Sequence, residues 1–164
     1  MFKRVALLLV VPLALAAVAM FLDASGSVAQ SSPCAPVAGT LASTANFSNL
    51  TTHGTISGDL EGTTFFQGDP SSLTPVTANT SPALSPTEHY TGDLTITTKH
   101  GLLKTRSVGV FEFVPNGLGT QFDRILGDQS TGKFAGTTGR LYFNFQLDGT
   151  GTMFTNTYTG QICS

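Results

Sequence analysis

Asp123 and Arg124 stand side by side in an apolar stretch, and they are the residues best placed to do chemistry. Neighbouring side chains of a strand point to opposite faces, so one of the two charges faces the interior if this stretch is a straight strand. Phe122 and Leu126 flank Arg124 on its face, which favours an inward Arg124. The alternative is a rim position, where both side chains reach water. A charge at the mouth of a pocket would polarise a substrate oxygen.

Other groups suited to acid–base, nucleophilic or metal chemistry are scattered along the chain. Asp59 and Glu61 form a carboxylate pair, but they alternate with Leu60, and this alternation predicts that both face solvent. No Ser-His-Asp or Cys-His arrangement is visible. Two cysteines and three separated histidines do not supply a metal site, so we expect neither a metal nor a cofactor. The histidines fall in predicted loops or at strand ends: His53, His89 and His100.

Residues 127–147 are punctuated by glycines and lead into the clearest strand pattern of the chain. From residue 141 to residue 147, apolar and polar side chains alternate, which predicts a strand with one buried and one solvated face. The glycines are not a phosphate-binding loop, because no helix follows them and no Lys-Ser/Thr pair stands in the required place. Alternation along the chain also predicts which aromatic residues face the interior and line a pocket there: Phe111, Phe113, Phe143, Phe145 and Phe154.

Short β-strands are the elements that must position these residues. The chain has 164 residues, of which only 11% are charged, and no segment shows a helical period. We count about seven or eight strands, which suits one all-β domain with a single core. Residues 54–67 give a firm strand pattern and residues 38–42 a weak one.

Two tight turns set the expected strand registers. Residues 100–101 (His-Gly) and residues 148–149 (Asp-Gly) are both typical of two-residue hairpin turns. The residue pairs that these turns would place opposite each other are Ile96 with Thr105, and Phe143 with Phe154.

Residues 68–88 interrupt the strand pattern. The segment cannot be a central strand, because proline removes a ladder hydrogen bond. A connection of this length in a compact domain is usually functional or irregular. It is interpreted either as a lid over a barrel mouth or as a surface loop. The prolines in it are Pro70, Pro75, Pro82 and Pro86.

Residues 1–29 have the features of a secretory signal peptide. A basic start precedes an apolar run over residues 5–22, and Ser-Val-Ala at residues 27–29 provides the small residues of a cleavage site. Cleavage after Ala29 makes residues 30–164 the β-barrel domain of a secreted or periplasmic protein. The alternative is an uncleaved membrane anchor, since the apolar run approaches the length of a membrane span.

Charge is sparse in residues 30–164, which carry six basic and nine acidic side chains. The sequence shows no basic patch that would neutralise phosphates, and this argues against a nucleic-acid partner. A membrane partner is expected only through an uncleaved N-terminal segment.

Cys34 and Cys163 are the only cysteines, and they lie near the two ends of the predicted domain. In an exported protein the two are expected to pair, with two free thiols as the alternative. A bridge between them would contribute roughly 4–5 kcal/mol in the chain-entropy description. It requires the first and last strands to lie side by side, as they do in a closed sheet.

Residues 122–127 and 130–141 resemble the allene oxide cyclase-like and dirigent-like β-barrel group. In that group a glycine-bounded element, G-T-G-x-F-x-G-A-x-G, leads into a strand. Here residues 130–139 read S-T-G-K-F-A-G-T-T-G, with Thr137 where the group often has alanine. The resemblance covers residues 90–147 and carries no activity, because the group's pocket residues cannot be matched one by one to this chain.

The resemblance implies a single antiparallel, calycin-like barrel of about eight strands with a central apolar cavity, often in a homo-oligomer. Its glycines are expected to adopt unusual φ angles or to form bulges, with an aromatic plug between them. These residues are Gly132, Gly136 and Gly139, and the plug is Phe134.

Three functions are compatible with the sequence. We favour a secreted barrel that binds a small apolar ligand or serves a structural role, because of the aromatic residues on its inward face. The second is an isomerase or cyclase of the allene oxide cyclase type acting on a lipid-like substrate, with Arg124 or Asp123 polarising an oxygen. It lacks a general base with a partner, so a non-enzymatic role is preferred. The third is an extracellular carbohydrate or protein interaction module, in which three tyrosines would stack on sugars: Tyr90, Tyr142 and Tyr158.

Overall fold

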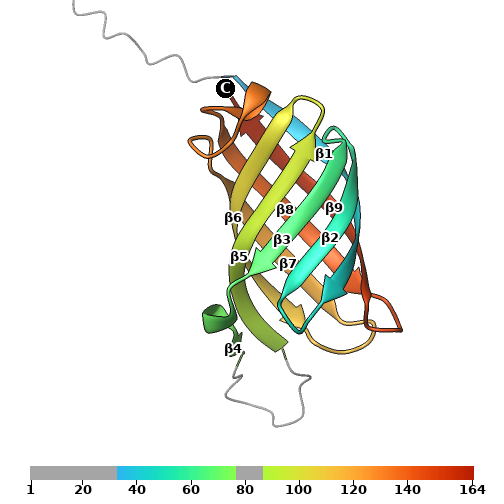
Figure 1. The fold of residues 1–164 in the computed structure, drawn as a ribbon. Helices are drawn as coiled ribbons and strands as arrows, with labels where there is room; N and C mark the ends of the chain where they lie inside the picture. The colour runs from blue at the N-terminus through green and yellow to red at the C-terminus, as the bar shows by residue number, and fades with distance from the viewer. Residues whose placement is uncertain (1–32, 77–86) are drawn as a thin grey trace, which may run out of the picture. The chain divides into compact units, whose positions relative to one another are not determined.

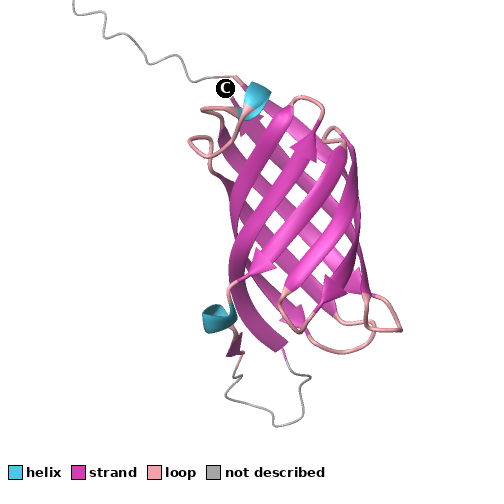
Figure 2. Cartoon of the chain, viewed as in Figure 1, coloured by secondary structure: helices cyan, strands magenta, loops and turns pink. Residues whose placement is uncertain are grey.

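The computed structural model describes residues 33–76 and 87–164. The predicted signal segment and residues 77–86 of the proline-rich segment lie outside the described residues. Within the described ranges, no helix is long and apolar enough to cross a bilayer. Nine strands and two short 3₁₀ helices are present there (Figures 1 and 2): β1 Cys34–Asn46, β2 Thr51–Gly58, β3 Gly62–Gly68, η1 Pro70–Ser72, β4 Thr74–Pro75, β5 Thr87–Thr98, β6 Gly101–Glu112, β7 Leu118–Ile125, η2 Gly132–Phe134, β8 Thr138–Leu147 and β9 Met153–Cys163.

Eight of these strands close into one antiparallel barrel, as Figure 1 shows. Strands that follow each other in the chain pair around the barrel, β3 pairs with β5, and β9 returns to pair with β1. The two-residue strand β4 pairs with the first part of β5, beyond the end of β3. The prediction of a single all-β barrel of about eight strands is confirmed. Closure removes the long unpaired edges that an open sheet would expose.

A disulfide joins Cys34 to Cys163 at one end of the barrel, with an S–S distance of 2.04 Å. The two cysteines are opposite each other in the β1–β9 ladder. The predicted bridge and the predicted contact between the first and last strands are therefore both confirmed. β1 has 13 residues and is much longer than the weak strand predicted over residues 38–42, because its ladder with β9 runs almost its whole length.

The β5–β6 hairpin has the predicted faces but not the predicted register. Ile96 pairs with Leu103, so the prediction of Thr105 in that place was wrong by two residues. The turn consists of residues 99–100. Gly101 is not part of this turn. It allows the β7–β8 loop to approach closely, because a Cβ at residue 101 would lie 2.3 Å from a backbone oxygen of that loop. An even shift leaves every side chain on its face of the sheet.

The β8–β9 hairpin is also shifted, here by four residues. Phe143 pairs with Tyr158 and not with Phe154. The connection is a five-residue loop over residues 148–152, because the Asp148 carboxylate accepts hydrogen bonds from two backbone amides at its far end (2.9 and 3.0 Å). Hydrogen bonds, the largest contribution being from the Thr150 hydroxyl, lower the pKa of Asp148 to about 2.

Residues 54–67, predicted as one strand, belong to two strands joined by a turn. β2 ends before residue 59 and β3 begins after residue 61. Leu60, at the turn, folds back into the barrel end, where its backbone N–H donates to the Tyr158 hydroxyl (2.9 Å). The two carboxylates of this turn face solvent, as predicted.

Phe134 on η2 closes the same end of the barrel. Its ring is 2% exposed and belongs to a core cluster that includes Leu60 and Tyr158. The flanking Gly132 and Gly136 have φ angles of 60° and 74°, which glycine adopts without steric cost. The unusual backbone angles and the aromatic plug predicted for this element are both present.

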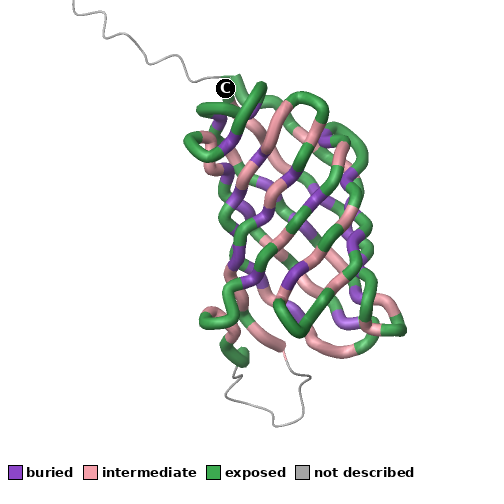
Figure 3. The backbone as a smooth tube through the Cα atoms, viewed as in Figure 1, coloured by how far each residue is buried: buried purple, intermediate pink, exposed green. Residues whose placement is uncertain are grey.

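Inward-facing glycines make room for aromatic rings at the other end of the barrel. An eight-stranded barrel is narrow, and side chains can fill its interior completely. The alternation of buried and exposed residues that this requires is visible in Figure 3. In three glycine–ring pairs, a Cβ on the glycine would lie 2.2 to 2.5 Å from the ring: Gly109 with Tyr90, Gly119 with Phe145, and Gly92 with Phe66. All three rings line the pocket described next.

Candidate functional site

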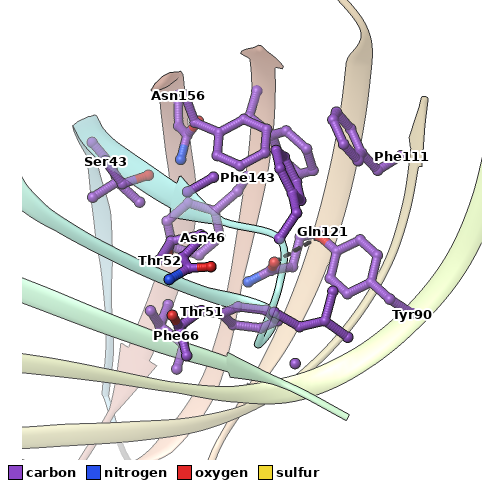
Figure 4. Close-up of a pocket in the computed structure, with 18 of the residues that line it drawn as sticks. Ser43, Asn46, Thr51, Thr52, Phe66, Tyr90, Phe111, Gln121, Phe143 and Asn156 are labelled. Atoms are coloured by element: carbon purple, nitrogen blue, oxygen red, sulfur yellow. Dashed lines mark hydrogen bonds between the residues drawn. The ribbon is translucent and has the colours of Figure 1, made fainter. Parts of the chain in front are cut away.

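A pocket of about 90 Å³ lies inside the barrel at the end away from the disulfide. Every strand of the closed barrel contributes residues to it. The β1–β2 loop adds side chains at its mouth, and Asp69 and Leu73 of the proline-rich segment line it as well. Figure 4 shows its lining: aromatic rings on several sides, with polar side chains among them. The predicted lid includes residues 77–86 of the proline-rich segment, which lie outside the described residues.

The aromatic lining contains all five phenylalanines predicted to face the interior. Phe111 is at the centre of this group, with ring-centroid distances of 4.7 Å to Phe113 and 5.3 Å to Phe154. These rings meet edge to face, which is a favourable aromatic geometry. The five predicted phenylalanines that line the pocket in the structure are Phe111, Phe113, Phe143, Phe145 and Phe154.

Two side chains of the β1–β2 loop form the mouth of the pocket. Phe47 is 38% exposed, and its ring lies 5.6 Å from that of Phe113 and 6.1 Å from that of Phe154. Leu50 has a φ of 54°, a left-handed conformation that costs a non-glycine residue about 1–2 kcal/mol. The β1–β2 loop therefore contributes apolar side chains on a strained turn to the mouth of the pocket.

The polar lining includes an amide with an unpaired acceptor. Asn156 on β9 is 7% exposed, and its Oδ1 is buried without a hydrogen bond. Leaving a buried acceptor unpaired costs about 1–3 kcal/mol. Across the pocket, Gln121 accepts a hydrogen bond from the Tyr90 hydroxyl (2.8 Å), drawn as a dashed line in Figure 4. Ser43, Asn46, Thr51 and Thr52 also belong to the polar lining.

Asp123, and not Arg124, faces the interior of the barrel. The Asp123 side chain has no exposed surface, whereas Arg124 is exposed on the outer face. The prediction of an inward Arg124 was wrong because Phe122, which shares its face, is itself 37% exposed on the outside. No guanidinium reaches the pocket through this strand, and Asp123 is not among the residues that line it.

A chain of hydrogen bonds links the pocket wall to the buried carboxyl of Asp123. Gln121 donates from Nε2 to Asp123 Oδ1 (2.8 Å) and to Ser107 Oγ (3.2 Å), and it accepts from Tyr90. Thr105 Oγ1 contacts Asp123 Oδ2 on the other side. The residues come from β5, β6 and β7, so register between three strands assembles this network.

Burial raises the pKa of the Asp123 carboxyl above its ordinary value of 3.8, and hydrogen bonds, first among them that from Thr105, oppose this rise. No ion pair to Asp123 is present in the described part of the chain. The Thr105 hydroxyl lies within reach of both Asp123 and the carbonyl of Leu94 (3.5 Å), yet it carries one hydrogen. A protonated Asp123 that donates to Thr105, which then donates to Leu94, satisfies all three groups.

Asp123→Asn is expected to make the barrel more stable at neutral pH and to have little effect in acid. Burial raises the pKa of Asp123 in the folded state above the value of 3.8 that it has in the unfolded state. The protonated carboxyl therefore makes its full contribution to stability below pH 3.8. This contribution is lost as the pH rises through the pKa of the folded state. Asparagine mimics the neutral form at every pH. Urea unfolding between pH 3 and pH 8 measures the difference.

The matched control is Asp128→Asn, an exposed carboxylate in the β7–β8 loop. A stability difference between Asp123→Asn and the unmodified protein that stays constant with pH would show that Asp123 is not protonated more readily in the folded state.

Histidines and carboxylates are scattered over the described part of the chain. No three His, Cys, Asp or Glu side chains among them gather into a metal-binding group. The three histidines are all exposed, away from the pocket lining. Comparison of the chain with protein-family models, with curated proteins and with solved structures finds no match. The resemblance to the allene oxide cyclase-like and dirigent-like group therefore stays a prediction.

Asn156 and Phe47 are two of the lining residues that the sequence analysis did not identify. Asn156 lies two positions from both Phe154 and Tyr158 on β9, so strand alternation would have placed it inside. Phe47 comes from a loop, where no periodic signal exists to assign it to the interior.

Proposed function

We propose that this protein is a secreted or periplasmic binding protein whose barrel takes up a small, largely apolar molecule carrying one hydroxyl group. The observation that carries the proposal is an aromatic-lined pocket whose wall contains Asn156 with an unpaired buried acceptor. Apolar pockets with a few placed polar groups are typical of small-molecule sites. The disulfide supports a location outside the cytoplasm, because disulfides persist in oxidising compartments.

The size of the pocket limits what is bound inside it. Its volume of about 90 Å³ is below the roughly 150 Å³ of an apolar cavity that holds benzene. A single ring would therefore occupy the pocket and extend into its mouth, where Phe47 is partly exposed. Larger molecules would bind with one end inside and the remainder projecting past Phe47.

The unpaired amide of Asn156 explains the requirement for a hydroxyl group. A hydroxyl both donates and accepts hydrogen bonds. It can therefore pair with the Asn156 amide whichever of the amide oxygen and the amide nitrogen points into the pocket. Apolar molecules without such a group would leave the acceptor unpaired, and their binding would lose the corresponding free energy.

Benzyl alcohol and toluene test this proposal as a matched pair that differs by one hydroxyl. Benzyl alcohol is expected to bind roughly tenfold more tightly, which corresponds to one net hydrogen bond. Asn156→Leu, which keeps the branched shape and the number of side-chain heavy atoms and removes the amide, is expected to abolish this preference. Binding is measured by ligand-observed NMR titration with the disulfide-bonded protein.

Thr64→Val is the control for Asn156→Leu. Thr64 also has a buried oxygen without a hydrogen bond, but it does not line the pocket. Both variants are expected to raise the free energy of unfolding by about 1 kcal/mol, because each removes an unpaired buried polar atom. Only Asn156→Leu should change the ligand preference. Absence of binding of either compound at millimolar concentration, or an unchanged preference in Asn156→Leu, would refute the proposal.

A further inference from the structure

Three arginines form a row on the outer wall of the barrel. Arg106 on β6 is opposite Arg124 on β7, and Arg124 is opposite Arg140 on β8. All three are exposed. Adjacent strands are about 4.8 Å apart, so the sheet brings together charges that are far apart in the sequence. The chain appeared to lack a basic patch only because its arginines gather through strand pairing.

This row carries unneutralised positive charge. Arg106 pairs with Asp93 on β5 (2.9 Å), but Arg124 and Arg140 have no ion pair within the described ranges. Like charges opposite each other on neighbouring strands destabilise a sheet. The row therefore weakens the free barrel slightly, and a bound anion would relieve the repulsion.

An apolar row runs parallel to the arginine row, one step further along the same strands. Val108 is opposite Phe122, and Phe122 is opposite Tyr142. Val108 is 49% exposed and Tyr142 is 41% exposed. The rings of Phe122 and Tyr142 lie 5.2 Å apart. Together they form an aromatic surface beside the positive charge.

A third row, of neutral polar residues, lies beyond the aromatic one. Thr120 on β7 is opposite Asn144 on β8, which is opposite Thr157 on β9. All are exposed. The outer wall thus presents guanidinium groups, aromatic rings, and hydroxyl and amide groups in three adjacent rows.

We propose that this outer wall binds an acidic polysaccharide, with its carboxylates on Arg124 and Arg140 and its sugar rings against Phe122 and Tyr142. Guanidinium groups bind carboxylates through paired hydrogen bonds. Aromatic rings accept the C–H faces of sugars, and the neutral polar row matches their hydroxyl groups. This site is separate from the pocket inside the barrel and does not depend on the function proposed for it.

Other occupants fit these rows less well. A second copy that packed the same face symmetrically would bring no carboxylate to Arg124 and Arg140, because the three rows contain none. A peptide would find no free strand edge here, because β6, β7 and β8 are paired on both sides. A nucleic acid gains its non-specific affinity from neutralisation of several phosphates by Lys and Arg, whereas the row offers two unpaired arginines in a chain of net charge −2.

Binding of an oligogalacturonate tests the proposal, with a neutral galactan oligomer of similar length as its counterpart. The oligogalacturonate is expected to bind and the galactan to bind at least tenfold more weakly. Arg124→Gln and Arg140→Gln are each expected to weaken oligogalacturonate binding about tenfold, the size expected for a lost hydrogen bond to a charged group. Tyr142→Ala should also weaken it. Isothermal titration calorimetry measures all of these.

Lys99→Gln is the matched control, because Lys99 is exposed in the β5–β6 turn and its loss changes the net charge equally. It should alter binding less than twofold, and the melting temperatures of the arginine variants should be unchanged or raised. Equal effects of Lys99→Gln and Arg124→Gln, or no oligogalacturonate binding, would overturn the proposal. The proposal would also be overturned if another anionic probe bound more tightly than oligogalacturonate. Tighter binding of oligothymidylate would indicate a nucleic acid, of polyglutamate an acidic peptide, and of phosphatidylglycerol vesicles an anionic membrane.

Discussion

Replacing Cys34 and Cys163 together with serine is expected to lower the free energy of unfolding by about 5 kcal/mol. The bridge joins residues separated by 129 positions, so it restricts almost the whole described chain in the unfolded state. The loss of chain entropy on closing a loop increases with its length, which makes this bridge more effective than a short one. It also holds together the ends of β1 and β9, where the barrel closes.

Denaturant unfolding of the two forms, followed by circular dichroism, measures this effect. The unmodified protein treated with dithiothreitol should unfold like the double serine variant, and dithiothreitol should leave that variant unchanged. Ala35→Ser, at an exposed neighbouring position of β1, controls for the change to serine. A loss of less than 1 kcal/mol would mean that the unfolded state is not restricted by the bridge as the chain-entropy argument requires.

Phe143→Ala is expected to cost about 3–5 kcal/mol, the range for removing a buried aromatic ring. Phe143 is 2% exposed and lies at the inner boundary of the pocket, where it belongs to the main core cluster. Its ring lies 5.8 Å from that of Tyr158, which in turn packs beneath the closed end. The substitution removes contacts to that core and enlarges the pocket at the same time.

Tyr142→Ala is the matched control for stability, since Tyr142 is the preceding residue on the same strand and faces outward. It should change the free energy of unfolding by no more than about 1 kcal/mol, because it removes one cross-strand aromatic contact on the surface. Phe143→Ala should also bind toluene more tightly than the unmodified protein, because the enlarged cavity accommodates the ring. Equal stability losses in the two variants would show that Phe143 does not support the core as its burial indicates.

Local alternation predicted which face of each strand is buried, even where the register was wrong. The aromatic residues 111, 143, 145 and 154 all point inward, although two hairpins are shifted by two and by four residues. Side chains repeat with a period of two along a strand, so an even shift leaves their direction unchanged. The same local reasoning predicted the disulfide, because only two cysteines are available.

Alternation failed at Asp123-Arg124 because the apolar neighbours were counted along a single strand. The outer wall carries its own apolar row, in which Phe122 pairs with Val108 and Tyr142. Those partners lie on other strands, and nothing in the local sequence identifies them. The apolar flank of Arg124 therefore belonged to the outer surface.

The sequence by itself determined the all-β class, the inward aromatic residues and the terminal disulfide, since each depends on residue type and on a period of two. Only the tertiary structure decided the pairing of strands, and with it the pocket, the hydrogen-bond network of Asp123 and the row of three arginines. Pairing depends on hydrogen bonds made by particular turn residues, such as the carboxylate of Asp148. It depends equally on barrel closure, which brings residues more than a hundred positions apart to the same place.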